Sequence, residues 1–166
     1  MKTLLFICIS INLFSASVNA QDWVSYRSVA GKFTVQLPSW PKETVDTSDS
    51  EHGPYVTHLF VCNADKDIFL VGWVDYDTSF HFDNKSEMLA NRDNFVKAVG
   101  ATVYETKDIS YKGNPGIEFT AGGENLFISS RVYIIGRRPY QLITVSKTGK
   151  ASRDLNRFYN SFKIGR

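Results

Sequence analysis

The sequence predicts an α+β domain: an antiparallel β-sheet with two amphipathic helices packed on it. Residues 115–146 contain three runs rich in β-branched and aromatic residues, separated by two short glycine-containing breaks. This arrangement is typical of an antiparallel meander. Residues 83–100 and 152–162 instead carry apolar residues at helical spacing. Because strands and helices do not alternate regularly, the order argues against a parallel nucleotide-binding fold.

The first twenty residues have the pattern of a secretory signal peptide. Lys2 precedes a mostly apolar stretch, residues 4–14, and small residues follow up to Ala20. The apolar stretch is shorter than the roughly 20 residues that a membrane span needs. We therefore expect cleavage after Ala20, a secreted or periplasmic location, and no stable membrane insertion afterwards. An uncleaved membrane anchor is the alternative.

Residues 21–166 are predicted to form a single α+β domain, since their number is ordinary for one domain. A domain of this size needs neither a disulfide nor a metal for stability. The formal net charge of the whole chain is +2, and removal of Lys2 brings it closer to zero. Near-neutrality argues against nucleic acid as a partner. Cys62 would be the only cysteine left, and its apolar neighbours favour a core position over a reactive thiol.

The first half of this domain reads as strands. Phe33, Val35 and Leu37 alternate with polar residues, which predicts a half-buried strand ending at Pro38. Residues 55–61 and 68–76 predict a hairpin around a polar turn. The polar segment before this hairpin, residues 41–53, is interpreted as an edge strand with a loop.

The second half adds the two helices and the meander. Asp83 or Asn84 is the expected N-cap of the first helix, and Gly100 is its expected C-terminal stop. Residues 101–110 predict a weaker strand that leads into the meander. Residues 152–162 place apolar side chains at positions i, i+3, i+4 and i+7, which predicts a helix docked on the sheet.

Four segments carry a resemblance to a known family. They are GKFTVQLPSW at residues 31–40, the helix with Met88, Arg92, Asp93 and Phe95, GNPGIEF at residues 113–119, and RVYIIGRRPY at residues 131–140. Together they resemble the Mog1/PsbP-like α/β/α sandwich family, especially its exported bacterial members. The resemblance covers most of residues 24–164. It implies a non-catalytic accessory or binding protein and assigns a role to no residue.

The densest group of candidate metal ligands begins at the end of the predicted hairpin and continues into the following loop. These residues are Asp75, Asp77, His81 and Asp83. Three carboxylates and an imidazole within nine residues could surround a divalent cation and serve a small metal-dependent hydrolase. An EF-hand loop would need glycine where Phe80 stands and a bidentate acid where Ser86 stands. The alternative is a solvated loop whose Asp83 caps the next helix.

A candidate ligand-binding cluster lies in the meander. Its members are Arg131, Tyr133, Arg138 and Tyr140. Planar cations beside aromatic rings can hold an acidic or carbohydrate ligand. The alternative is structural: Arg138 lies at a solvated hairpin tip, and Arg131 pairs with Glu118 on a neighbouring strand.

No residue is predicted to be catalytic, and no cofactor is predicted. His52 and His58 could act as acid and base, with Glu51 near the first, but the sequence lacks a Gly-x-Ser-x-Gly nucleophile motif. The glycine pairs lack the spacing and the lysine of a phosphate loop. We therefore expect an exported, non-enzymatic accessory or binding domain. Its partner would be a protein or a small ligand, held by one sheet face or by the loop at residues 76–83.

Overall fold

The computed structural model describes residues 22–50 and 53–165. The predicted signal peptide and the candidates Glu51 and His52 lie outside this described part. The described elements, in chain order, are β1 (Val24–Ser28), β2 (Phe33–Leu37), β3 (Lys42–Ser50), β4 (Gly53–Ala64), β5 (Asp67–Tyr76), α1 (Asn84–Ala98), β6 (Thr102–Tyr111), β7 (Asn114–Gly123), β8 (Leu126–Ile135), β9 (Arg138–Ser146), α2 (Leu155–Ser161) and β10 (Lys163–Ile164).

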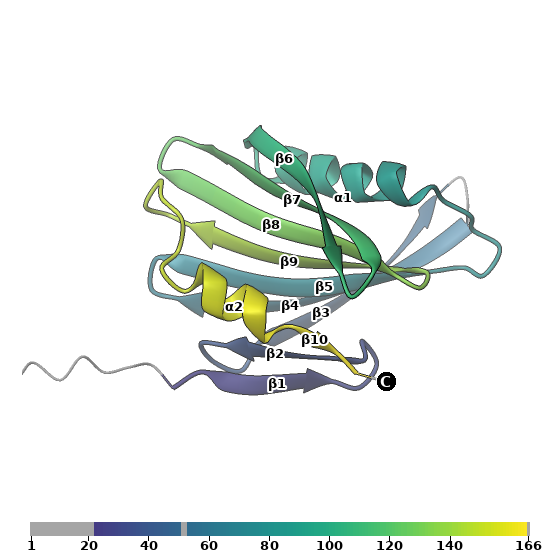
Figure 1. Ribbon diagram of the computed structural model, residues 1–166, viewed down its shortest axis with the longest axis horizontal. Helices are drawn as coiled ribbons and strands as arrows, with labels where there is room; N and C mark the ends of the chain where they lie inside the picture. Colours follow the sequence, from purple (N-terminus) through teal and green to yellow (C-terminus); the bar gives the residue numbers. More distant parts are fainter. Residues whose placement is uncertain (1–21, 51–52, 166) are drawn as a thin grey trace, which may run out of the picture.

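A seven-stranded sheet forms the centre of the molecule (Figure 1). Its strand order is β3-β4-β5-β9-β8-β7-β6, and every neighbouring pair is antiparallel. The β7-β8-β9 meander and the β4-β5 hairpin are confirmed. The chain therefore enters the sheet as two blocks of consecutive strands, and the pairing of β5 with β9 joins them.

The prediction of one sheet with two helices packed on it is wrong, because β1, β2 and β10 form a second, three-stranded sheet. The result is a β-rich fold in which this small sheet and α2 lie on one face of the large sheet and α1 lies on the other (Figure 1). The buried side chains of β2 cannot reveal from their alternation which sheet the strand joins. The two-residue β10 is also too short to give a periodic signal.

Helix α1 is confirmed, and the side chain of Asp83 caps it by accepting a hydrogen bond from the Ser86 amide at 2.8 Å. Helix α2 is shorter than predicted. Residues before Leu155 instead form a turn in which the Ser152 hydroxyl accepts a hydrogen bond from the Asp154 amide at 3.2 Å. Neither of these helices is long and apolar enough to span a bilayer.

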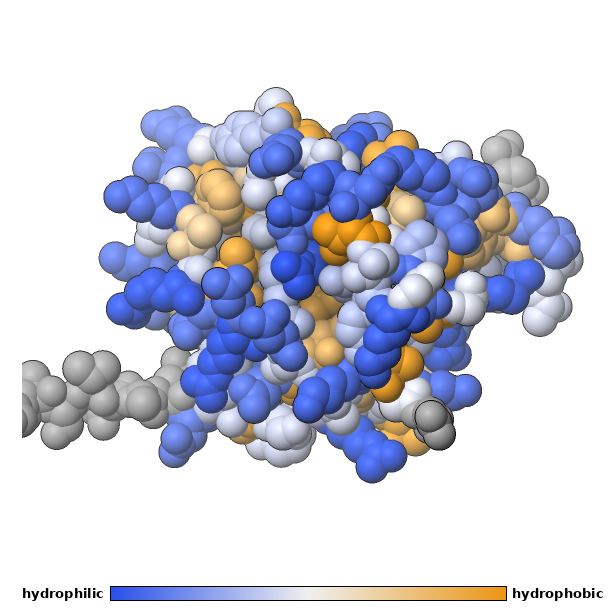
Figure 2. Space-filling model, in the orientation of Figure 1, coloured by the Kyte–Doolittle hydropathy of each residue, from blue (hydrophilic) through white to orange (hydrophobic). Residues whose placement is uncertain are grey.

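Two apolar cores flank the large sheet, one on each face. The core beneath the small sheet and α2 is rich in aromatic rings, among them Phe33, Trp73 and Phe162. Cys62 is 2 % exposed in this core, as predicted. The core beneath α1 is mainly aliphatic and includes Met88, Ile117 and Val132. In Figure 2 the face that carries α2 is largely hydrophilic, with scattered apolar patches.

Candidate functional site

Helix α1 packs on β6, β7 and β8, so it shields only part of its face of the large sheet. Beside the helix lies a groove of about 620 Å³. Strands β4, β5 and β9, the β5-α1 loop and α1 all contribute to its wall. Its aromatic members are Tyr55, Tyr76, Phe80 and Phe95, and its larger polar members are Glu87, Asn91, Asn94 and Gln141.

Glu87 is the one charged side chain among the described residues that line this groove. It lies in the first turn of α1 and is only 8 % exposed. Its Oε1 atom accepts hydrogen bonds from the Tyr76 hydroxyl and, at 2.6 Å, from Asn91 Nδ2. Within residues 22–50 and 53–165, no lysine, arginine or histidine forms an ion pair with Glu87. Neutral donors therefore hold this carboxylate.

Tyr76 connects the carboxylate to the aromatic wall. Its ring lies 4.7 Å from Phe80, 5.4 Å from Phe82 and 5.9 Å from Tyr55, measured between ring centroids. Burial raises the pKa of the Tyr76 phenol, and its hydrogen bond to Glu87 raises it further. Tyr76 is therefore a neutral donor under ordinary conditions.

The loop between β5 and α1 is fixed by an arginine from a distant turn. Arg137, in the β8-β9 turn, donates hydrogen bonds to the main-chain oxygens of Asp77, at 3.3 Å, and Phe80. Asp77 also accepts hydrogen bonds from the amide and hydroxyl of Ser79. These bonds hold the aromatic side of the groove against the sheet.

A smaller hollow of about 70 Å³ continues the groove along the sheet, because both share Thr57, Val74, Asn91 and Gln141. Its remaining lining includes Leu59, Gly72 and Ile143. Gly72 allows β4 and β5 to approach closely, since a Cβ atom there would lie 2.6 Å from the main-chain oxygen of His58. The groove thus has an aromatic and polar mouth and an apolar extension.

The structure gives the predicted metal ligands other partners. Asp75 forms an ion pair with Arg138 at 2.5 Å, accepts a hydrogen bond from the Trp73 indole at 3.1 Å and faces His58 at 3.5 Å. Asp77 binds Ser79, and Asp83 caps α1, which matches the structural alternative for that residue.

His81 is exposed on the same loop. In the part of the chain that the structure describes, no three His, Cys, Asp or Glu side chains are grouped to hold a metal ion. A centre built from Asp75, Asp77, His81 and Asp83 stays a prediction from sequence.

The predicted ligand-binding cluster lies on two paired strands, with Tyr133 directly opposite Tyr140, but both of these rings are buried. Tyr133 and Tyr140 are 5 % and 3 % exposed in the aromatic core, and the Tyr140 hydroxyl donates to the main-chain oxygen of Gly31 at 3.0 Å. Arg138 pairs with Asp75 and also donates to the main-chain oxygen of Ala30. The structure therefore does not bring the two rings to the surface beside the arginines.

Arg131 follows the structural alternative. Its guanidinium pairs with Glu118 at 2.6 Å and lies 4.4 Å from the centroid of the Tyr159 ring. Lys107 also contacts Glu118, at 2.6 Å. Burial opposes ionisation of Glu118, but the hydrogen bonds from Lys107 and Arg131 outweigh it and lower the pKa of this carboxyl. Ligand binding by Arg131, Tyr133, Arg138 and Tyr140 stays a prediction.

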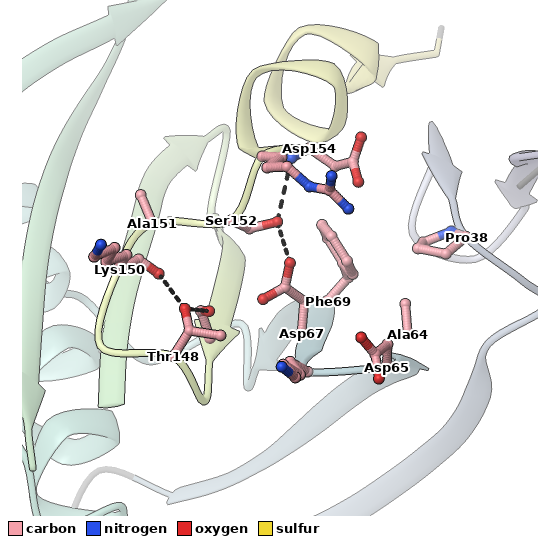
Figure 3. Close-up of a pocket in the computed structure, with 13 residues that line it drawn as sticks. Pro38, Ala64, Asp65, Asp67, Phe69, Thr148, Lys150, Ala151, Ser152 and Asp154 are labelled. Carbon is pink, nitrogen blue, oxygen red and sulfur yellow. Dashed lines mark hydrogen bonds between the residues drawn. The ribbon is translucent and has the colours of Figure 1, made fainter. Parts of the chain in front are cut away.

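A second cavity, of about 430 Å³, lies where the β4-β5 turn meets the segment between β9 and α2 (Figure 3). The Ser152 hydroxyl points to Asp67 and donates a hydrogen bond to its carboxylate at 2.5 Å. The lining carries both signs of charge: Lys66, Lys150 and Arg153 are basic, and Asp65, Asp67 and Asp154 are acidic. Because its charges balance and its hydroxyls bond within the wall, the cavity favours no ligand class.

Sequence reasoning did not identify the groove beside α1. The available signal was the spacing of Glu87 and Asn91, which stand one helical turn apart next to the buried Met88. Two polar residues on the sheet-facing side of a helix indicate either an internal hydrogen bond or a site. The aromatic partners come from β4, β5 and the following loop, and only the fold brings them to this helix.

Neither a protein-family model nor a curated protein sequence matches the chain. A match among solved structures is the solution structure of cyanobacterial PsbP from Synechocystis sp. PCC 6803. The two chains share 8 % sequence identity with a TM-score of 0.58, over 89 % of this chain and 95 % of the PsbP chain. At this identity the likeness shows a PsbP-like fold and carries no residue role.

Proposed function

We propose that the chain is a non-catalytic binding domain of an exported protein, with its ligand site in the groove beside α1. The observation that supports this is a concave groove of about 620 Å³ in which aromatic rings surround a nearly buried carboxylate. Binding sites for small molecules are typically concave and mainly apolar, with a few converging polar groups. The PsbP-like fold is compatible with such a role without specifying it.

The chemistry of the groove supports binding over catalysis. The described lining includes no serine or cysteine beside a histidine, which is one common arrangement for nucleophilic catalysis. Glu87, its one acid, is engaged by Tyr76 and Asn91. These bonds orient the carboxylate, which would then bind a ligand in the groove.

Nuclear magnetic resonance tests the binding site. The purified, ¹⁵N-labelled protein is titrated with mixtures of neutral, cationic and anionic small molecules, and the amide signals that move are mapped. We expect saturable shifts for residues of β4, β5 and the first two turns of α1. Shifts that map only to the second cavity, near Ser152, would assign binding to that cavity and contradict the proposal.

Export is a separate part of this proposal, supported by the sequence of residues 1–20. Expression with cell fractionation and intact-mass measurement checks it. We expect protein outside the cytoplasm whose chain starts at Gln21. A cytoplasmic protein that still begins with Met1 would contradict export while leaving the groove proposal intact.

A further inference from the structure

We propose that the groove beside α1 binds an organic cation, specifically an alkylated ammonium group. This inference rests on the proposed function and specifies its ligand class. Two features carry it: the carboxylate of Glu87 has no cationic partner in the described part of the chain, and aromatic rings stand next to that carboxylate.

The carboxylate of Glu87 has acceptor capacity that the described residues do not use. Both recorded side-chain hydrogen bonds, from Tyr76 and Asn91, end on Oε1. An ionised carboxylate offers about four acceptor positions over its two oxygens. Among the described residues no fully buried side-chain oxygen lacks a partner, so Oε2, to which no described residue donates, keeps some exposure, and Glu87 lines the groove. A ligand cation placed there would supply the missing charge.

The aromatic wall suits the same cation. The Tyr76 hydroxyl donates a hydrogen bond to Glu87, and the Tyr76 ring contacts the rings of Tyr55 and Phe80. The aromatic group is therefore connected directly to the carboxylate. Ring faces carry negative electrostatic potential and attract cations, by up to about 2 kcal/mol or more in a desolvated site. The groove thus places the negative charge of Glu87 beside ring faces of negative electrostatic potential.

The lining also selects against other ligand charges. No lysine, arginine or histidine lines the main groove in the described part of the chain, and His58, which lines the smaller hollow, faces Asp75, so an anion would find no free positive partner in the main groove. Val74 at the junction and Leu59 and Ile143 in the smaller hollow offer apolar contact. A methylated ammonium fits these surroundings better than a primary one, because it has no N–H groups that need hydrogen bonds and it carries apolar methyl groups.

A matched pair of probes isolates the contribution of the charge. Choline and 3,3-dimethylbutan-1-ol have nearly the same shape, but only choline is positively charged. Each is titrated into the ¹⁵N-labelled protein at low salt. We expect choline to shift amides of the groove saturably and the neutral alcohol to bind about tenfold more weakly or worse. Equal affinity for the two probes would overturn the proposal.

Two variants test the residues involved. Glu87→Gln keeps a similar shape and an acceptor for Tyr76, and we expect choline affinity to fall about tenfold or more. Glu124→Gln, at an exposed turn, is the matched control and should bind as the unaltered protein does. If Glu87→Gln loses its folded spectrum, Tyr55→Leu replaces it: loss of the ring should weaken choline binding, and unchanged binding would reject the aromatic contribution.

The outcomes distinguish a wrong ligand class from a wrong binding site. If neutral compounds shift groove signals but ammonium compounds do not, the ligand class is wrong and the binding site stands. If no compound shifts the groove, both proposals fail. Flotation with phosphatidylcholine vesicles distinguishes the source of the cation, because a lipid headgroup would carry the protein upward while a preference for free choline would leave it behind.

Discussion

Tyr76 donates a hydrogen bond from its hydroxyl to the carboxylate of Glu87, and this bond joins the end of β5 to the first turn of α1. The two residues stand on either side of the loop that contains Phe80 and Phe82. Their bond therefore closes that loop and positions the acid beside the aromatic rings of the groove. The same pair serves the stability of the fold and the geometry of the candidate site.

Replacement of Tyr76 by phenylalanine should destabilise the protein by about 1–2 kcal/mol at neutral pH, because a nearly buried carboxylate loses a donor. The raised pKa of Tyr76 in the fold also predicts a dependence on alkaline pH. The stability that this phenol contributes is fully present below its unfolded pKa of about 10 and declines as the pH rises above it.

Urea unfolding of both proteins between pH 7 and 11 measures these effects. The variant should show the smaller alkaline loss of stability, since it lacks the shifted phenol. If both proteins lose stability in parallel, the pKa of Tyr76 is the same in the folded and unfolded states, and this prediction is wrong.

Glu118 predicts the opposite behaviour, in acid. Its pKa is lowered in the fold despite partial burial, because Lys107 and Arg131 bind its carboxylate. Its stabilising contribution is therefore present above its unfolded pKa of about 4.3 and is lost as the pH falls through the lower folded value. Glu118→Gln should cost about 1–2 kcal/mol at pH 7, and this cost should shrink as the pH falls below about 4.

Denaturant unfolding at several pH values below 7 checks this, with the exposed Glu124→Gln as the control. A stability difference that stays constant down to pH 3 would mean that the ion pairs of Glu118 do not determine its titration.

Phe33 tests the packing of the second sheet. The residue is 1 % exposed, and its ring lies 5.8 Å from both Trp73 of the large sheet and Phe162 after α2. Phe33→Ala should lower the free energy of unfolding by about 3–5 kcal/mol, through lost burial and the cavity left behind.

Val29→Ala, at a position 81 % exposed, is the control and should change stability by no more than about 0.5 kcal/mol. Calorimetric melting compares the two. Equal and small effects would show that the three-stranded sheet adds little to the stability of the fold.

Metal titration tests the predicted centre at Asp75, Asp77, His81 and Asp83. Any cation there would have to displace Arg138 from Asp75 and the helix cap from Asp83. We therefore expect calcium, zinc and manganese to produce neither binding heat nor a rise in melting temperature. A stoichiometric heat that Asp77→Asn abolishes would restore the metal-centre hypothesis.

Local patterns predicted most individual elements because their signals are contained in neighbouring residues. The β-branched and aromatic runs of the meander, the cap at Asp83 and the pairing of Arg131 with Glu118 all depend on local composition, short-range spacing or adjacent strands. The assignment of strands to sheets failed for β1 and β2, because alternation records that one side of a strand is buried and not what covers it.

The candidate site was less predictable than the fold. The predicted arginine–tyrosine cluster relied on residues close in sequence, yet Tyr133 and Tyr140 point into the core while the arginines pair with acids. The groove instead combines Tyr55, Tyr76 and Gln141 with α1, and these residues belong to four separate elements. No spacing rule connects them.

The sequence by itself determined most of the strands and both helices, though not β10 or the start of α2, because propensity, period and capping are properties of neighbouring residues. The tertiary structure alone decided that the first two strands and the last one form their own sheet. It also decided that Glu87 meets Tyr76 and a ring from β4 beside an uncovered part of the large sheet. These contacts join residues whose proximity arises only when the whole chain minimises its exposed apolar surface.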